Sequence, residues 1–271
     1  MTTIHPSAVV DPNAKIGENV KIGPLCVVGP NVEIGNGCEL VAQVHIAGHT
    51  SLGENNTIYP FASLGTPPQD YDFKGDVSYL NIGSGNTFRE GFTANPGTKP
   101  GTETKIGNDC FFMANSHVAH NCVIGNNVIM ANDALPAGYS HIGDRAILAG
   151  LTAVHQFCRV GRLAMIGGCC AISKDLPPFM ICFSKNNRVS GLNLIGMKRN
   201  GVSPESIKAM KKVYKIYFRS ALNPKDAVKK IEDEVDKTPE VQEFLDFLKN
   251  TQRGILSPPE RKTAASAEND K

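Results

Sequence analysis

The stretch IGNDCFFMANSHVAHNCVIGNNVIMANDALPAGYSHIG, residues 106–143, decides the fold because an apolar residue returns at every sixth position. The recurring residues are Ile106, Phe112, Val118, Ile124, Met130 and Ile142, and only Pro136 interrupts them. An α-helix cannot use this period, because apolar positions six residues apart would spiral around its surface. Short strands joined by turns can use it, with one side chain of each hexad pointing inward. Hexapeptide repeats of this kind are typical of a parallel β-helix.

The repeat extends well beyond this stretch, from Ile4 to Ile172. Its interruptions are few, at Asp70, Asp76, Ala94, Pro100 and Pro136. Three hexads should close one triangular coil of about 18 residues, with the strands of neighbouring coils about 4.8 Å apart. Glycine often follows the apolar residue, as at Gly107 and Gly125. We expect these glycines at corners of the coil that need a positive φ.

Seven of the eight cysteines share one phase of the repeat, four places after the apolar position. They are Cys26, Cys38, Cys110, Cys122, Cys158, Cys170 and Cys182, and only Cys169 falls outside this phase. Alanines also occupy the phase, so we expect a second, small inward slot in each hexad, filled by buried thiols. Because the sequence has no Cys-x-x-Cys pair, it predicts neither disulfides nor a metal centre.

The extent of the repeat predicts a mainly β protein in which residues 1–190 form a parallel β-helix. Two segments leave the repeat, residues 65–81 and 95–105, and should form external loops. Residues 191–256 should form a C-terminal α-helical domain, and the polar residues 257–271 should form a disordered tail.

The start of the helical domain has a recognisable pattern. Ser203, Pro204 and Glu205 fit a capping residue, a first-turn proline and an acidic first turn. Helical periodicity continues through Ser220. Two further helices are expected, over residues 223–237 and 239–249.

The composition argues against several classes of function. With 28 basic and 26 acidic side chains, the formal net charge is +2, which indicates neither a nucleic acid nor an anionic membrane as partner. No apolar run approaches the roughly 18 residues that a membrane span needs. The N-terminus, MTTIHPSAVV, lacks the basic and apolar regions of a secretory signal. We therefore expect a cytoplasmic protein with no membrane span.

Stacking of the coils predicts which distant residues meet. Residues about 18 apart should lie above one another, so His120, Gly138 and Gln156 should form one column. A second column of small residues, which could line a groove, should contain Ala114, Asn132, Gly150 and Gly168. His117 and His155 are harder to place. They either cap strand corners or meet histidines of another subunit in a cleft.

Several motifs together resemble the UDP-N-acetylglucosamine 3-O-acyltransferases of lipid A biosynthesis. They are HVAHNC (117–122), AVHQF (153–157), GGC (167–169), DLPPF (175–179), GLN with MKRNG (191–201), and QD at 69–70. The resemblance implies a left-handed coil and a homotrimer with active sites between subunits. It also implies transfer of a 3-hydroxyacyl group from acyl carrier protein to the 3-hydroxyl of UDP-N-acetylglucosamine, the first step of lipid A biosynthesis, with neither cofactor nor metal.

The resemblance also implies roles for individual residues. His120 would be the general base, a task that suits the ordinary histidine pKa of about 6.5. The backbone N–H of Gly138 would stabilise the oxyanion. Gly168 lies where the family measures acyl length, and its missing side chain leaves room for a long chain. The residues expected to bind sugar, phosphates, nucleotide or pantetheine are Asp70, Lys74, His117, Tyr139, His155, Gln156, Asn193 and Arg199.

This sequence departs from the family pattern at several of these positions. Asn121 follows the base where an aspartate is common, and Tyr139 stands where a histidine is often found. Asp72 occupies the usual place of a lysine, for which Lys74 could substitute. Asn200 replaces a frequent arginine and Ile195 a frequent glutamate. Because the changes cluster at nucleotide-sugar contacts, a modified amino-sugar nucleotide remains an alternative acceptor.

Other functions fit parts of the pattern. A zinc hydratase of the γ-carbonic-anhydrase kind also uses hexapeptide coils, but it needs three histidines at each metal. An N-acyltransferase of the later lipid A steps would carry an extra N-terminal domain, whereas this repeat starts at Ile4. A non-catalytic nucleotide-sugar binder is a third alternative.

Basic residues follow one face of the first long helix. They are Lys208, Lys211, Lys212, Lys215 and Arg219. The stripe is either an ordinary solvated face or a docking surface for the acidic acyl carrier protein.

Overall fold

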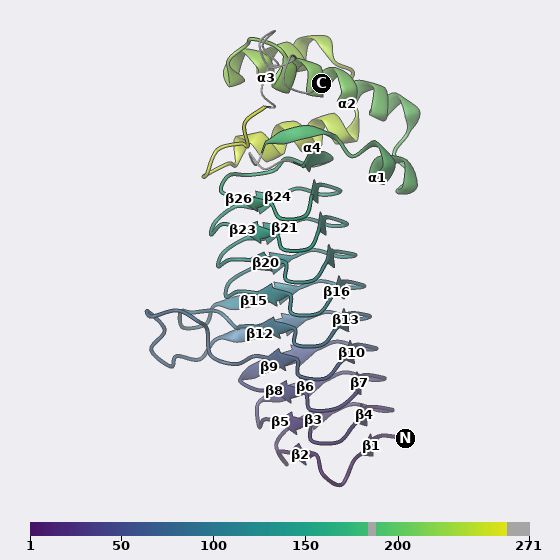
Figure 1. Ribbon diagram of the computed structural model, residues 1–271, viewed down its shortest axis with the longest axis vertical. Coiled ribbons are helices and arrows are strands. Elements are labelled where there is room, and N and C mark those ends of the chain that lie inside the picture. The colour runs from purple at the N-terminus through teal and green to yellow at the C-terminus, as the bar shows by residue number, and fades with distance from the viewer. Residues whose placement is uncertain (184–187, 259–271) are drawn as a thin grey trace, which may run out of the picture.

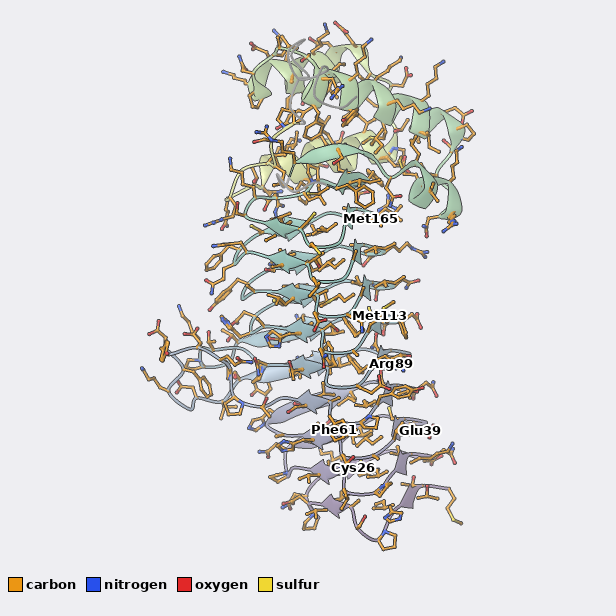
Figure 2. The ribbon with its side chains drawn as sticks, in the orientation of Figure 1. Cys26, Glu39, Phe61, Arg89, Met113 and Met165 are labelled. Atoms are coloured by element: carbon orange, nitrogen blue, oxygen red, sulfur yellow. The ribbon has the colours of Figure 1, made fainter. Side chains whose placement is uncertain are left out.

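The computed structural model describes residues 1–183 and 188–258. Figure 1 shows a tall stack of coils with the N-terminus at one end and helices across the other. Short strands of successive coils pair in parallel and build three flat faces, as the period of six predicts. The side chains repeat in rows from coil to coil (Figure 2).

The strands fall into one sheet on each of two faces and two sheets on the third. The first face is β1 (Thr3–Ile4), β4 (Lys21–Ile22), β7 (Glu39–Leu40), β10 (Thr57–Ile58), β13 (Thr87–Phe88), β16 (Phe111–Phe112), β19 (Ile129–Met130), β22 (Ile147–Leu148), β25 (Met165–Ile166), β27 (Met180–Cys182) and β28 (Val189–Leu192). The second face is β3 (Lys15–Ile16), β6 (Val32–Ile34), β9 (His49–Leu52), β12 (Tyr79–Ile82), β15 (Glu103–Ile106), β18 (Val123–Ile124), β21 (His141–Ile142) and β24 (Arg159–Val160). The third face is β2 (Val9–Val10), β5 (Val27–Val28), β8 (His45–Ile46), β11 (Ser63–Leu64), β14 (Thr93–Ala94) and β17 (His117–Val118), followed by β20 (Leu135–Pro136), β23 (Ala153–Val154) and β26 (Ala171–Ile172).

Three corners join these faces, and each is named here after one of its residues. The His120 corner leads from the third face to the second, the Arg145 corner from the second to the first, and the Gly168 corner from the first to the third. A face between two corners is about six residues wide, which at strand rise is about 20 Å.

The third face is divided into two sheets at Pro136. The N–H groups of His117 and Ala119 donate to the carbonyl oxygens of Ala134 and Pro136. Because proline has no N–H, Pro136 cannot donate the next hydrogen bond of the ladder to the coil below. The ring of Pro136 is nevertheless buried in the inward position of the hexad, and so is Ala94. Both residues therefore fill the inward slot of the core, although they interrupt the apolar series in the sequence.

The two interruptions of the repeat are loops between the third and second faces, and both project from one side of the stack (Figure 1). Paired residues lie 30 apart across the first loop, Leu64 with Ala94, and 24 apart across the second, Ala94 with Val118. Uninterrupted coils pair residues 18 apart, so the loops insert 12 and 6 residues. They end at residues 78 and 102, slightly earlier than predicted, because β12 and β15 are four residues long.

The glycines that follow the apolar position were predicted for the wrong reason. Gly107 does not have a positive φ, but a Cβ atom there would lie 2.5 Å from the carbonyl oxygen of Gly125 in the next coil. Glycine is thus required by the close approach of two backbones. Positive φ occurs two residues later, where Asn115, Asn121 and Asn127 have φ of 59°, 58° and 57°. Asparagine tolerates this conformation better than most residues.

The cysteine prediction is confirmed. The seven cysteines of the shared phase are buried in the stack, and Cys169 is exposed. Burial raises the pKa of the Cys122 thiol to about 12, so it remains a neutral packing group. Across residues 1–183 and 188–258, no helix is long and apolar enough to cross a membrane.

Four helices cover the C-terminal end of the stack in the part of the chain that the structure describes. They are α1 (Leu194–Arg199), α2 (Pro204–Arg219), α3 (Pro224–Glu234) and α4 (Pro239–Lys249). The start of α2 is as predicted, because the Ser203 side chain accepts a hydrogen bond from the Ser206 N–H. The sequence pattern did not predict α1. Of the predicted tail, residues 259–271 lie outside the described residues.

A buried carboxylate ties the end of the chain to the last coil. Asp175 is fully buried, and its carboxylate accepts hydrogen bonds from the backbone and guanidinium of Arg159 and from the Thr251 hydroxyl. Its backbone also pairs with the segment after α4, at Gly254 and Leu256. These hydrogen bonds hold residues 251–256 against the side of the stack that carries the His120 corner.

Close stacking of coils predicts different costs for two glycines in the same repeat phase. A Cβ atom at Gly23 would lie 1.8 Å from the Val41 carbonyl oxygen, whereas one at Gly29 would lie 3.5 Å from the Ile46 oxygen. We expect Gly23→Ala to lower the free energy of unfolding by about 3 kcal/mol. Gly29→Ala should change it by less than about 1 kcal/mol. Denaturant unfolding of both variants measures this, and equal losses would contradict the stacking argument.

Candidate active site

The centre of the site is the imidazole of His120, which is almost completely buried at its corner. Gly138 lies on the next coil, as the column prediction required, since the Tyr139 N–H donates to the His120 carbonyl oxygen at 3.0 Å. A Cβ atom at Gly138 would lie 2.4 Å from Cε1 and 2.5 Å from Nε2 of the ring. Only glycine therefore leaves space for the imidazole here.

The backbone N–H of Gly138 is an available donor beside the ring. Within residues 1–183 and 188–258 it has no hydrogen-bond acceptor. At the Arg145 corner, by contrast, the N–H at this repeat position donates to a side chain of the next coil, as the Asn126 N–H does to Asp144 at 2.7 Å. The His120 corner thus pairs an imidazole with an unused backbone donor, an arrangement suited to stabilising an oxyanion.

The ring of His120 has a polar partner on each nitrogen. Nδ1 lies 3.1 Å from Oδ1 of Asn121, and Nε2 lies 3.6 Å from Oδ2 of Asp70. Asp70 comes from the first loop, and its other carboxylate oxygen accepts the N–H of Asp72 at 3.0 Å. The first loop therefore reaches the imidazole, as the role expected of Asp70 requires.

His117 lies on the third face below this corner, half-buried. Its Nδ1 is 2.7 Å from the hydroxyl of Thr93 in the coil beneath. Burial, and to a lesser extent the neighbouring His120, lower the pKa of His117. The ring is therefore neutral at pH 7 and can serve as a donor or acceptor at the edge of the site.

On the coil above Gly138, the column that starts at His120 continues with exposed side chains. His155 and Gln156 are both exposed. Arg253, in the segment held by Asp175, places a guanidinium nitrogen 3.2 Å from Nδ1 of His155. Sequence reasoning did not identify Arg253, because its position depends on the C-terminal segment and not on the repeat.

Two expected binding residues have polar end groups that are bonded to the loops and not to His120. Lys74 is exposed, and its ammonium donates to the carbonyl oxygen of Tyr71 within the same loop. The hydroxyl of Tyr139 is directed to Thr98, at 3.1 Å, in the second loop. The ring of Tyr139 lies edge-on to His120, with 5.3 Å between centroids.

Asn193 and Arg199 lie at a different place, in a cleft of about 630 Å³ beside the Arg145 corner. The side chain of Asn193 caps α1 by accepting the Gly196 N–H and also donates to the Leu163 carbonyl oxygen. Met165, whose position below α1 Figure 2 shows, lines the same cleft. Asn200 lines it too, and its amide oxygen accepts a hydrogen bond from Arg145.

Gly168 lies at the third corner, exposed, directly above Gly150. A Cβ atom at Gly168 would only touch the Gly150 carbonyl oxygen, at 3.4 Å, so this column forms an open strip of small residues as predicted. The predicted site residues are consequently spread over all three corners of one chain. Among residues 1–183 and 188–258, no group of three His, Cys, Asp or Glu side chains is placed to bind a metal ion.

Comparison with known proteins identifies the family. Residues 175–256 match the family described as Udp N-acetylglucosamine O-acyltransferase, domain 2. Residues 1–36, 13–48 and 103–135 match bacterial transferase hexapeptide repeats. An acyl-[acyl-carrier-protein]–UDP-N-acetylglucosamine O-acyltransferase from Anaeromyxobacter sp. (strain Fw109-5) is 48% identical over 93% of this chain and 98% of its own length. Another from Janthinobacterium sp. (strain Marseille) is 41% identical over 94% and 100%.

Solved structures indicate the same family. The UDP-N-acetylglucosamine acyltransferase of Bacteroides fragilis 9343 superposes with a TM-score of 0.91 at 42% identity, covering 94% of this chain and 100% of that one. The protein from Acinetobacter baumannii gives 0.90 at 39% identity, over 93% and 99%. The predicted fold, a left-handed parallel β-helix with a C-terminal helical domain, is confirmed. The chain belongs to the acyl-[acyl-carrier-protein]–UDP-N-acetylglucosamine O-acyltransferase family.

Proposed function

We propose that this chain transfers a 3-hydroxyacyl group from acyl carrier protein to the 3-hydroxyl of UDP-N-acetylglucosamine, with His120 as general base. The observation that carries the proposal is the imidazole packed against the unused N–H of Gly138. Family membership supplies the substrates, and this geometry supplies the means of acyl transfer. The reaction would be the first step of lipid A biosynthesis, in the cytoplasm.

The transfer can be written with each proton accounted for. Nδ1 of His120 faces the amide oxygen of Asn121, so the neutral ring can carry its proton on Nδ1 and keep Nε2 unprotonated. The Asp70 carboxylate, 3.6 Å from Nε2, is close enough to stabilise the imidazolium once Nε2 has taken a proton. Nε2 takes the proton of the sugar 3-hydroxyl as its oxygen attacks the thioester carbonyl. The carbonyl oxygen becomes an oxyanion that accepts the Gly138 N–H. When the C–S bond breaks, the imidazolium returns the proton to the leaving thiolate.

Other residues around His120 would position the substrates. Asp70 is an acceptor close to Nε2, where the attacking sugar must lie, so its carboxylate can bind a neighbouring sugar hydroxyl. His117 lies on the same coil as His120, and His155 and Gln156 lie two coils above it near the same corner. These three residues would bind the sugar, its phosphate or the pantetheine arm. Lys74 would join them only if the first loop moved, because its ammonium is bonded within that loop.

The distribution of residues over three corners supports a homotrimer with shared sites. His120 and the cleft of Arg199 are separated by a face about 20 Å wide, which is too far for one small sugar to bridge. The outward side chains of the upper third face are apolar, namely Leu135, Ala153 and Ala171. An apolar flat face is suited to packing against another copy of the chain, which would bring a second corner to His120. Arg199, Asn193 and Gly168 would then act across the subunit interface.

The first prediction tests the base. We expect His120→Ala to lower kcat by about 10²–10⁴-fold while circular dichroism and thermal unfolding stay near those of the wild type. The matched control is His45→Ala, which removes an exposed imidazole from the third face lower in the stack and should retain activity. The assay follows product mass, using 3-hydroxyacyl carrier proteins of several lengths with UDP-N-acetylglucosamine and with its 3-amino analogue. Activity retained by the His120 variant would refute the base assignment.

The second prediction tests the shared sites. His120→Ala and Arg199→Ala should each be inactive alone. If a site takes His120 from one subunit and Arg199 from the next, trimers reassembled from an equal mixture should regain about a quarter of wild-type activity. A mixture that stays inactive, with subunit exchange verified by native mass spectrometry, would show that both residues act within one chain.

The basic stripe on α2 yields a third prediction. Lys211, Lys212 and Lys215 are exposed on the helix that covers the end of the stack. Reversing all three to glutamate should raise KM for the acidic acyl carrier protein about tenfold or more, with kcat unchanged, because charge steers encounter. A control triple reversal of the exposed Lys15, Lys21 and Lys105 should not change KM. An unchanged KM in the α2 variant would mean that the stripe is only a solvated face.

A further inference from the structure

Thr98, in the second loop, connects Asn121 and Tyr139, two residues that differ from what the family resemblance leads us to expect. Thr98 is 95% buried, although it lies in an external loop. Its backbone N–H donates to Oδ1 of Asn121 at 3.0 Å, and its hydroxyl lies 3.2 Å from the same oxygen. The hydroxyl of Tyr139 lies 3.1 Å from Oγ1 of Thr98. An unbroken polar chain therefore runs from Tyr139 through Thr98 and Asn121 to His120.

The backbone N–H of Thr98 determines the donor and the acceptor of each hydrogen bond between Tyr139, Thr98, Asn121 and His120. A backbone N–H can only donate, so the amide atom of Asn121 that faces Thr98 must be its oxygen. That oxygen only accepts, so the Thr98 hydroxyl donates to it, and Tyr139 must donate to Thr98 Oγ1. The same oxygen faces Nδ1 of His120, so Nδ1 must carry the proton.

An amide needs this support more than a carboxylate does. A carboxylate presents acceptors on both oxygens, so either orientation holds a proton on Nδ1. A carboxamide rotated by half a turn would present its NH2 group instead. The ring would then accept at Nδ1 and carry its proton on Nε2, where it could not take a proton from a substrate.

We propose that Thr98 and Tyr139 are positioning residues that lock the Asn121 amide and thereby fix the tautomer of His120. The inference rests on the proposed function of His120 for its effect on catalysis. It also gives Tyr139 a different role from the substrate contact expected from the sequence. The Tyr139 ring is itself held in place, stacked on Phe157 with centroids 4.9 Å apart.

The catalytic test is a double-mutant cycle. Thr98→Val removes one of the two donors to Asn121 Oδ1, and with it the link to Tyr139, but keeps the backbone N–H and the shape of the side chain. The weakened lock should lower kcat about tenfold with little change in KM. Thr98→Ser should restore most of kcat. In an Asn121→Asp background, where either orientation of the carboxylate accepts, Thr98→Val should cost less than about threefold. A role confined to packing of the loop would instead give the same loss in both backgrounds, and that result would overturn the proposal.

A matched control is available in the same loop. Thr102 donates its hydroxyl to the Lys99 carbonyl oxygen and makes no contact with Asn121. Thr102→Val should therefore leave kcat unchanged. Tyr139→Phe keeps the ring but removes the hydroxyl that orients Thr98, and should lower kcat by a smaller factor than Thr98→Val, about threefold.

A second measurement is independent of catalysis. Long-range ¹H–¹⁵N correlation spectra of protein labelled at histidine, with His120→Ala to assign the signal, report which ring nitrogen carries the proton. Above pH 8 the wild type should show protonated Nδ1, and Thr98→Val should show a mixture of both tautomers. An unchanged spectrum in Thr98→Val would overturn the proposal even if His120 proves to be the base. Conversely, a changed spectrum with activity retained in His120→Ala would leave the lock standing and remove the base assignment.

Discussion

The structure depends on the backbone hydrogen bonds that join each coil to the next. Because these bonds pair each residue with one 18 positions away, they fix the rotation of every coil relative to its neighbours. A chain that places one imidazole at a corner therefore places a defined residue directly above it. At the His120 corner that residue is Gly138, and its N–H has no other acceptor among the described residues. The proposed chemistry is thus a consequence of register, and no flexible element has to bring the two groups together.

This register also explains which features the sequence predicts and which it leaves unpredicted. The inward apolar slots, the buried cysteines and the columns of His120 and Gly168 could all be predicted by counting from one hexad to the next. The loops insert residues that do not belong to any coil, so counting cannot place their side chains. Asp70 was expected at the site only from the family resemblance, and Thr98 was not expected there at all. Nothing in the repeat indicates that Thr98 reaches Asn121 across 23 positions.

The glycines after the apolar positions were located correctly by the periodicity, but the physical reason expected for them was wrong. A glycine after each apolar residue fits either a positive φ or a close approach of two backbones, and the sequence cannot separate these causes. The structure assigns Gly107 to close approach and gives the positive φ to Asn115 and Asn121. Asn121 therefore has two functions. Its backbone turns the corner of the coil in the left-handed region, and its amide oxygen lies 3.1 Å from the His120 ring.

These two functions explain why an asparagine can serve beside the proposed base. Asparagine tolerates the left-handed conformation somewhat better than most residues, and it places no second charge beside the Asp70 carboxylate that already faces the ring. An amide, however, presents an acceptor on one side only, so its benefit depends on neighbours that choose its orientation. Thr98, in the second loop, and Tyr139, on the next coil, fix the orientation of the Asn121 amide through their hydrogen bonds. Asn121 and Tyr139 are therefore better understood as one coupled arrangement than as two independent side chains.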